Sequence, residues 1–293
     1  METSKNFEVR EDLRQSEEYG KYIERIGWKA IKIQDPGEAN ASRSRFRFQI
    51  FIRKLGPVSI AKIQRVDLPL PWEKLDQVLK KYRVFMCKLE PLGSDSGFMI
   101  RDLRIRGYGQ DGWPMLGTKT LRISLSGSRS SIYDSFKKDC RYGIRNAQIS
   151  MNNVQLNKFD DFYKMWRRAN RIKKLWTPPK RDYDALGQSF GEKCFCITVN
   201  NLTGCLVLLH KNTSFYYFSG SLPEGKRLNF PYLAVWEAMK EAKKRGCRVW
   251  DFEGIYDPRW PNNSWKGFSH FKKSFGGEEV EYCGSFTRWR LPF

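Results

Sequence analysis

The stretch that decides the fold lies near the C-terminus and reads WDFEGI at residues 250–255, then GFSHFKKSFGGE at residues 267–278. The first part is typical of a buried strand that ends in an aspartate and a glycine turn. A loop rich in Pro, Asn and Trp follows, and the second part predicts the start of a short aromatic and basic helix closed by a Gly-Gly turn. This order of strand, loop and helix favours an α/β chain.

Working outward, helix and strand patterns alternate in the N-terminal half. Residues 15–27 predict a helix with Ser16 as N-cap and Gly27 as its stop. Residues 72–82 predict a second helix, which Pro71 opens. Strands are predicted at residues 28–33, 46–52, 83–89 and 98–105.

The C-terminal half repeats the pattern with longer helices. Helices are predicted at 132–147, at 159–171 and from Pro231 to Gly246, and strands at 121–125, 194–199, 204–210, 214–219 and 248–252. Asn200 and Asn201 suit the turn of a hairpin between the second and third of these strands. Both halves therefore predict an α/β (α+β) fold.

Composition narrows the class of protein. The chain has 293 residues, which suits two domains, and no stretch nears the roughly 20 apolar residues of a membrane span. Its N-terminus is polar, so we expect no secretory signal. A net charge of +21, from 53 basic and 32 acidic residues, indicates a polyanionic partner, with a simply basic surface as the alternative.

The seven cysteines and two histidines give little indication of a metal site or a redox site. The cysteine count is odd and no C-x-x-C motif occurs, so reduced, buried thiols are expected. His210 and His270 have no partners at ligand spacing, and we expect no metal.

Several segments in order resemble the FemABX family, the aminoacyl-tRNA-dependent aminoacyltransferases of peptidoglycan bridges. The similar segments are LRQS (13–16) with IGW (26–28), LGPV (55–58), Lys137 with RYGIRNA (141–147), YYFSG (216–220), NFPY (229–232), WE (236–237), AKKRG (242–246) and the C-terminal stretch quoted above. Each motif is loose, but together they span most of residues 13–290.

The resemblance implies two GNAT-like domains around a central cleft. Domain 1 would be residues 1–126, completed by 277–293, and domain 2 residues 127–276. The helical arm that some family members insert has no room here. The implied protein is a cytoplasmic monomer in cell-wall biogenesis and cell shape, at or near the inner face of the membrane.

The implied reaction moves an amino acid from aminoacyl-tRNA to an amine of a peptidoglycan precursor, either lipid II or a UDP-MurNAc-peptide. Because the ester is already activated, no cofactor, metal or covalent nucleophile is needed. Lys272 matches the family lysine at the reacting centre, and Phe271 would help to position the intermediate. A solvated Lys272-Lys273 pair is the alternative.

Further site residues follow from the same resemblance. Lys32 matches a diphosphate-binding lysine, and Glu90 stands where the family has an aspartate near the acceptor peptide. Tyr216 or Tyr217 matches a cleft tyrosine, and Asp251 either binds substrate or caps the next turn. The tRNA-binding candidates form a basic helical face of Lys137, Lys138, Arg141 and Arg145. The family's phosphate-binding Arg in domain 2 has no clear match.

Two other classes of function stay open. An acyl-CoA-dependent GNAT enzyme would grip pyrophosphate with a Gly-rich turn at a helix N-terminus, but residues 226–231 read KRLNFP. A non-catalytic RNA-binding protein would keep the basic faces and would not need Lys272 beside Phe271.

Overall fold

The computed structural model describes residues 11–34, 46–93 and 97–291. Contacts divide these residues into a first unit, 11–118 with 281–291, and a second unit, 119–280. The division falls at 118/119 and not at 126/127, because the strand at Lys119–Ser124 pairs with Val249–Asp251 inside the second unit. The mixed α/β architecture expected from the sequence is confirmed.

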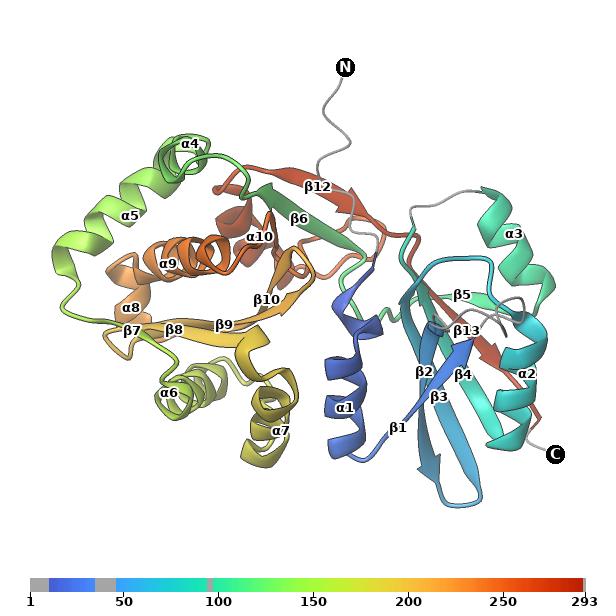
Figure 1. The fold of residues 1–293 in the computed structure, drawn as a ribbon. Coiled ribbons are helices and arrows are strands. Elements are labelled where there is room, and N and C mark those ends of the chain that lie inside the picture. Colours follow the sequence, from blue (N-terminus) through green and yellow to red (C-terminus); the bar gives the residue numbers. More distant parts are fainter. Residues whose placement is uncertain (1–10, 35–45, 94–96, 292–293) are drawn as a thin grey trace. The chain divides into compact units, whose positions relative to one another are not determined.

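The first unit is a six-stranded sheet with helices on both faces (Figure 1). Its strands are β1 (Lys29–Gln34), β2 (Phe46–Leu55), β3 (Val58–Val66), β4 (Val84–Pro91), β5 (Gly109–Asp111) and β13 (Ser285–Trp289), in the order β1-β2-β3-β4-β13-β5. Its helices are η2 (Leu13–Gln15), α1 (Glu17–Arg25), α2 (Trp72–Lys81) and α3 (Gly97–Ile105). α2 and α3 cover one face, and α1 lies on the other.

One strand prediction in this unit was wrong. Residues 97–105 form helix α3, in which Leu103 is fully buried and Met99 and Ile100 pack against the same core. Their spacing of three and four residues is that of a helix face, but so short an apolar run also fits the strand that the sequence predicted. The helix at residues 15–27 is confirmed as α1, with the Ser16 hydroxyl accepting from the Tyr19 amide at 3.1 Å.

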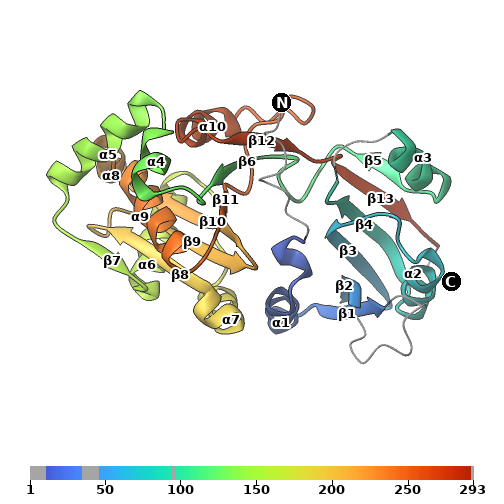
Figure 2. The ribbon, with the colours of Figure 1, turned by 45° about the horizontal axis from the view of Figure 1, so that its top comes forward.

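The second unit is a seven-stranded sheet between two helical layers (Figure 2). Its strands are β6 (Lys119–Ser124), β7 (Val154–Leu156), β8 (Cys194–Val199), β9 (Thr203–His210), β10 (Thr213–Ser221), β11 (Val249–Asp251) and β12 (Glu278–Glu281), in the order β12-β6-β11-β10-β9-β8-β7. Its helices are α4 (Arg129–Asp134), α5 (Lys138–Ser150), α6 (Phe159–Ile172), α7 (Lys180–Phe190), η3 (Gly191–Lys193), α8 (Pro223–Arg227), α9 (Phe230–Lys244) and α10 (Trp265–Lys273).

The two faces of this sheet differ in their cores. On the face that α5 and α9 cover, Cys205, Val207 and Trp250 pack with helix residues such as Leu233 in one large apolar cluster. On the other face, α6 packs across β8, β9 and β10, and the Trp166 ring stacks on Phe218 with centroids 4.3 Å apart. The basic helix expected at 132–147 is two helices, α4 and α5, broken where Phe136 turns into the core.

All seven cysteines are buried, as the sequence predicted, and burial raises the pKa of the Cys87 thiol to about 11. Among the described helices, none combines the length and the apolar content that a bilayer crossing needs.

Candidate active site

Lys272 is a buried lysine in the last turn of α10, with 9% of its surface exposed. Its Nζ donates to the carbonyl oxygens of Phe252, at 2.8 Å, and Gly254, at 2.7 Å. Burial lowers the pKa of Lys272 to about 8, while the nearby Glu253 and Asp251 carboxylates raise it. The side chain is therefore an ammonium at neutral pH, and it lies at the turn that follows β11.

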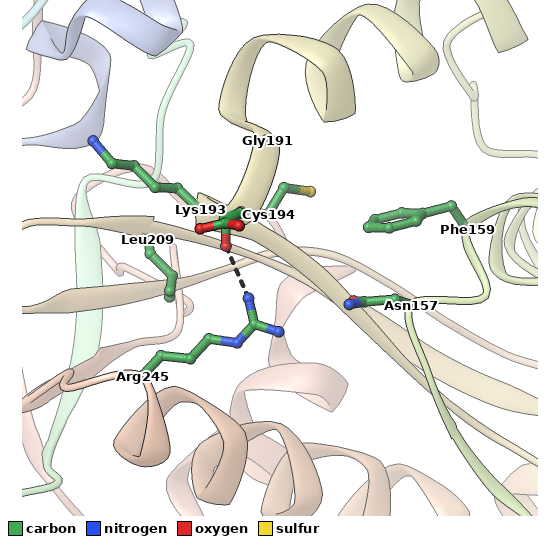
Figure 3. Close-up of a pocket in the computed structure, with 8 residues that line it drawn as sticks. Asn157, Phe159, Gly191, Lys193, Cys194, Leu209 and Arg245 are labelled. Atoms are coloured by element: carbon green, nitrogen blue, oxygen red, sulfur yellow. Dashed lines mark hydrogen bonds between the residues drawn. The ribbon is translucent and has the colours of Figure 1, made fainter.

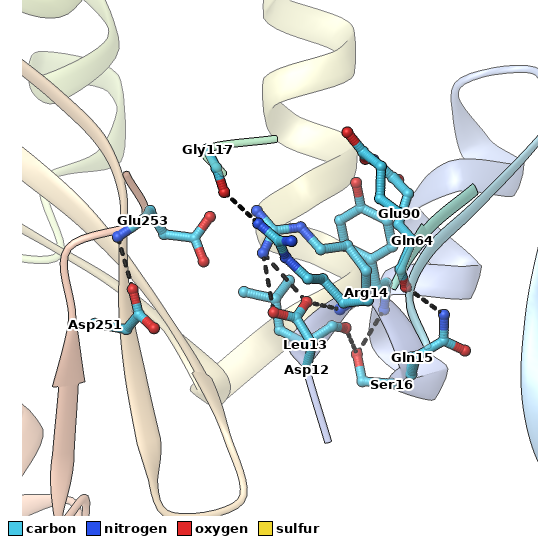
Figure 4. A network of polar contacts seen from close by, with 12 residues as sticks. Asp12, Leu13, Arg14, Gln15, Ser16, Gln64, Glu90, Gly117, Asp251 and Glu253 are labelled. Atoms are coloured by element: carbon cyan, nitrogen blue, oxygen red, sulfur yellow. Dashed lines mark hydrogen bonds and ion pairs between the residues drawn. The ribbon is translucent and has the colours of Figure 1, made fainter. Parts of the chain in front are cut away.

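That turn has a strained backbone that holds both carbonyls toward the ammonium. Glu253 adopts a left-handed φ of 61°, and Gly254 has a φ of 139°. The Asp251 carboxylate fixes the turn, because its Oδ1 accepts from the Glu253 amide at 2.8 Å (Figure 4). The same oxygen accepts from the Thr120 hydroxyl at 2.6 Å. The Asp251 Oδ2 accepts from Arg122 Nε at 2.9 Å. Strain of this kind persists only where neighbouring groups over-determine it.

Asp251 therefore has a clear structural role. Its side chain is only 3% exposed, and both oxygens bind groups of the second unit. Of the two roles predicted from the sequence, turn capping is what the structure displays. A direct contact of Asp251 with substrate stays a prediction.

Aromatic rings surround the ammonium. Lys272 Nζ lies 4.8 Å from the centroid of Phe268, 5.7 Å from Tyr216 and 5.8 Å from Phe252. Phe268 precedes Lys272 by four residues on α10, so the two side chains share a helix face. Ring faces attract a cation without neutralising its charge, so the site keeps a positive group in an apolar setting.

The structure distinguishes the two candidate tyrosines. β10 bulges between Tyr216 and Phe218, so the paired residues are Tyr216 with Val207 and Phe218 with Leu206. Tyr216 is buried beside Lys272, and burial raises the pKa of its hydroxyl. Tyr217 is half-buried at the bulge, where it contacts the Phe218 ring.

Phe271 does not share the surroundings of the Lys272 ammonium. Its ring packs on Tyr232, at 4.9 Å, and on Phe275, at 5.4 Å, against the core under α9. The contacts of Phe271 fix the position of α10, and its direct part in the reaction stays a prediction.

Glu90 is a buried carboxylate in the first unit, with 1% of its surface exposed. Its Oε1 accepts from the backbone amides of Met115, at 2.6 Å, and Leu116, at 3.0 Å. Its Oε2 accepts from Gln64 Nε2 at 3.4 Å, and the Gln64 carbonyl accepts from Gln15 Nε2 at 2.6 Å. The carboxylate thus holds the segment after β5 onto the end of β4.

The same network explains the LRQS motif (Figure 4). Gln15 Oε1 accepts from the Gln49 amide at 2.8 Å, and Gln49 Nε2 donates to the carbonyls of Arg14 and Ser16. These contacts join η2 and the start of α1 to the middle strands of the first sheet. A contact of Glu90 with an acceptor peptide stays a prediction, because its two oxygens already accept three hydrogen bonds here.

Lys32 lies on the surface of β1 and pairs with Glu17 of α1 at 2.7 Å. The two side chains are 45% and 59% exposed, so solvent screens the pair strongly. The diphosphate contact expected of Lys32 stays a prediction.

The four candidate tRNA-binding residues divide into two kinds. Lys137, Lys138 and Arg145 are exposed at and along α5. Arg141 instead donates from Nη1 to the carbonyls of Asp134, at 2.9 Å, and Phe136, and thereby caps the end of α4. The first three are available to bind phosphate, and Arg141 joins α4 to α5.

A hollow of 640 Å³ in the second unit lies between the end of α7 and α9 (Figure 3). Arg245 lines it, but its Nη1 donates to the Glu192 carbonyl at 2.8 Å and its Nε to Glu241 at 2.7 Å. Cys194 also lines it, and burial raises the pKa of that thiol. Because the thiol stays protonated and the guanidinium is bound, this hollow has little catalytic chemistry.

The first unit has a larger groove, of 760 Å³, on the sheet face opposite α2. Trp28, Met86 and Trp113 help to line it, together with Lys62. Lys62 Nζ lies 4.8 Å from the Trp28 ring, and none of the described residues forms an ion pair with it. Burial, then the charge of Arg14, lowers the pKa of Lys62 to about 8.

Sequence reasoning missed several of these residues. Arg122 sits between Leu121 and Ile123 in β6, and a charge inside an apolar strand is a signal of a buried ion pair. Phe268, four residues before Lys272, was recognisable from helical spacing. Lys62 in β3 has no such signal, because the strand itself had not been predicted.

Comparisons with known proteins give similarities in fold and in one stretch of the sequence. Residues 196–290 match the model of the FemAB family. A crystal structure of FemX is similar over 96% of this chain and 92% of that one, with a TM-score of 0.79 and 15% identity. No curated protein matches the sequence.

Two further solved structures share the fold at 10% identity. One is the C-terminal DUF2156 domain of a candidate lysylphosphatidylglycerol synthetase from Agrobacterium fabrum, with a TM-score of 0.59 over 94% of this chain and 89% of that one. The other is a tandem GNAT protein from the clavulanic acid pathway, at 0.52 over 85% and 81%. The GNAT-like fold of two units is confirmed. Within it, residues 196–290 match the FemAB family model, in line with the resemblance found in the sequence.

Proposed function

We propose that this protein is an aminoacyltransferase that moves an amino acid from aminoacyl-tRNA to an amine of a peptidoglycan precursor. The observation that carries the proposal is the Lys272 ammonium, buried among aromatic rings and held on two backbone carbonyls. The match to the FemAB family model includes Lys272, the turn after β11 and Tyr216.

The proposed chemistry needs a positive group but no covalent enzyme intermediate. The acceptor nitrogen attacks the ester carbonyl carbon, and the carbonyl oxygen becomes an oxyanion. The new C–N bond then remains, the C–O bond to the ribose breaks, and the proton from the amine ends on the ribose oxygen. An ammonium has three N–H donors, and the carbonyls of Phe252 and Gly254 occupy two in Lys272. The third would stabilise the oxyanion.

The groove beside Lys62 supports an acceptor that has both apolar and anionic parts. Its aromatic and methionine walls suit an apolar or ring-bearing group. The Lys62 ammonium, which forms no ion pair with a described residue, suits a phosphate or carboxylate. A peptidoglycan precursor has such groups, whether its carrier is a lipid or a nucleotide. In this proposal Lys32 contacts the acceptor, and Glu90 serves it indirectly by holding Met115, which lines the groove. The exposed Lys137, Lys138 and Arg145 bind tRNA phosphates.

The backbone at α9 disfavours acyl-CoA as the donor. Asn229 is left-handed with a φ of 59°, Phe230 is fully buried, and Pro231 has no N–H to offer a phosphate. A Gly-rich, amide-lined turn is therefore missing at the place where a GNAT enzyme would use one.

The test is transfer of a radiolabelled amino acid from a pool of charged tRNAs onto lipid-linked and soluble precursors, with labelled acyl-CoA as the control donor. Label that moves from tRNA supports the proposal and identifies the amino acid and the carrier. Label that moves only from acyl-CoA would replace it with the GNAT alternative. Binding of tRNA without any transfer would favour an RNA-binding protein.

A further inference from the structure

Helix α6 ends in a surface that displays three apolar side chains. Ile172 is 55% exposed, Leu175 56% and Trp176 78%. By contrast, the opposite face of the same helix buries Phe162, Met165, Trp166 and Ala169 against the sheet. Single exposed apolar residues are common, but three within five positions form a patch that calls for an explanation.

The backbone holds this patch in a fixed conformation. Lys174 is left-handed with a φ of 55°, the Leu175 amide donates to the Asn170 carbonyl at 2.9 Å, and the Lys174 amide donates to the Arg171 carbonyl at 3.1 Å. This is the hydrogen-bond pattern of a Schellman cap, in which the residue after the left-handed position commonly packs back on the helix. Here that residue is Leu175, and it faces solvent.

Positive charge surrounds the apolar side chains. From residue 162 to residue 181 the sequence has eight basic residues and no acidic one. Lys180 and Arg181 form ion pairs with aspartates. None of the described residues forms an ion pair with the other six basic residues, which are Lys164, Arg167, Arg168, Arg171, Lys173 and Lys174.

We propose that this surface, Ile172, Leu175 and Trp176 with the cations of α6, docks the protein onto an anionic lipid bilayer. Aliphatic and indole side chains among Lys and Arg are the composition of segments that enter the headgroup region. The anionic leaflet attracts the cations, and burial of the three side chains adds an apolar contribution.

Two other occupants fit less well. RNA would use the cations and could stack a base on Trp176, but it gives Ile172 and Leu175 nothing to pack on. A second copy of this chain would bring two strongly positive surfaces together, and like charges oppose that contact. The docking goes beyond aminoacyl transfer, since it needs no reaction at Lys272.

The experiment is co-sedimentation of the purified protein with vesicles of phosphatidylglycerol and phosphatidylcholine, and with vesicles of phosphatidylcholine alone. The wild type is expected to bind the anionic vesicles and to bind the neutral ones much more weakly. The triple variant Ile172→Ser, Leu175→Ser, Trp176→Ser should bind the anionic vesicles at least about tenfold more weakly. These side chains are exposed, so the variant should melt as the wild type does.

The matched control is Ile105→Ser, which removes an aliphatic side chain that is 76% exposed at the end of α3 in the first unit. It should bind vesicles as the wild type does. A charge variant, Arg168→Gln with Lys174→Asn, should lose the preference for anionic vesicles, and Asn tolerates the left-handed position. Unchanged binding of the triple variant would overturn the proposal. The proposal would also be overturned if the triple variant bound vesicles as the wild type does but bound tRNA more weakly or lost a dimer that the wild type forms.

Discussion

The two units each contain a buried charged side chain that is held by two backbone groups, and these two charges have opposite sign. Lys272 holds its ammonium on two carbonyls of a strained turn, and Glu90 holds its carboxylate on two amides of the segment after β5. Glu90 also accepts from a glutamine, within a network that reaches η2. Lys272 has aromatic rings as its other neighbours.

The comparison distinguishes a carboxylate, Glu90, whose two oxygens both accept hydrogen bonds within the fold from an ammonium, Lys272, that keeps one N–H available for another acceptor. Both Glu90 oxygens accept hydrogen bonds, so removing the group should mainly cost stability. Lys272 has a third N–H, a lowered pKa and apolar surroundings, which strengthen its interaction with a developing negative charge. Removing it should mainly cost rate.

The largest expected effect is that of Lys272→Met on transfer. Loss of the oxyanion donor should lower kcat by about 10²- to 10³-fold. Lys272→Arg should recover part of that loss, because it restores a cation with a different shape. Single-turnover transfer from charged tRNA measures both variants.

Thermal unfolding of the same variants is the control for Lys272. Methionine leaves the carbonyls of Phe252 and Gly254 without this donor, at a cost of about 1–3 kcal/mol. A folded Lys272→Met variant that turns over within a few-fold of the wild type would refute the catalytic assignment.

The next effect is an alkaline limb in the rate. If the ammonium is the active form, kcat/KM should fall above pH 8, by about tenfold per pH unit. The free energy of unfolding should instead increase as the pH rises. The folded pKa of about 8 lies below the unfolded value of 10.5, so the penalty of burying the charge is full below pH 8 and is relieved as pH rises to 10.5.

A pH series of transfer rates and of unfolding midpoints tests this pair of opposite slopes. Lys272→Arg supplies the comparison, because an arginine keeps its charge throughout the range and should show no alkaline limb. If the alkaline limb of the wild type persists unchanged in the arginine variant, then a group other than Lys272 causes it.

Glu90 should give a smaller, structural effect. Glu90→Ala leaves the amides of Met115 and Leu116 unpaired and should destabilise the protein by about 1–3 kcal/mol. Glu90→Gln keeps an accepting oxygen and should be milder. Urea unfolding measures both. If Glu90→Gln instead abolishes transfer while stability is retained, the carboxylate binds the acceptor directly and the contrast with Lys272 disappears.

The smallest effect on stability is expected at Lys32. Its pair with Glu17 is exposed, so Lys32→Ala should change stability by less than about 1 kcal/mol. A raised KM for the acceptor, with kcat retained, would support the expected phosphate contact. Glu17→Ala is the matched control, and it should leave that KM unchanged.

Most of the fold could be predicted from the sequence because its signals are local. The Asn200-Asn201 hairpin has two positive φ angles, 49° and 55°, which asparagine tolerates, and Pro231 opens α9 as expected. Helix α7 and strand β3 were not predicted. α3 was predicted as a strand, because its short apolar run fits either period and only the packing of Leu103 decides it.

The site was predictable only in part, for a physical reason. Lys272 came from the family resemblance, but its carbonyl partners lie 18 and 20 residues away and depend on the Glu253 backbone. The buried pair of Arg122 with Asp251 joins residues 129 positions apart, and no local pattern encodes that pairing. Tyr216 could not be distinguished from Tyr217, because the bulge in β10 sets which one faces inward.

The strand order of the first sheet has a consequence for the order of synthesis. β13, residues 285–289, lies between β4 and β5, so β5 has no partner strand in this sheet until β13 arrives. The second sheet also needs β11 and β12, which lie just before β13 in the chain, so both sheets are completed only when the C-terminal segment is available. The edge of β4 then stays open until the last strand joins it, and a nascent chain halted before residue 285 would expose that edge to other chains.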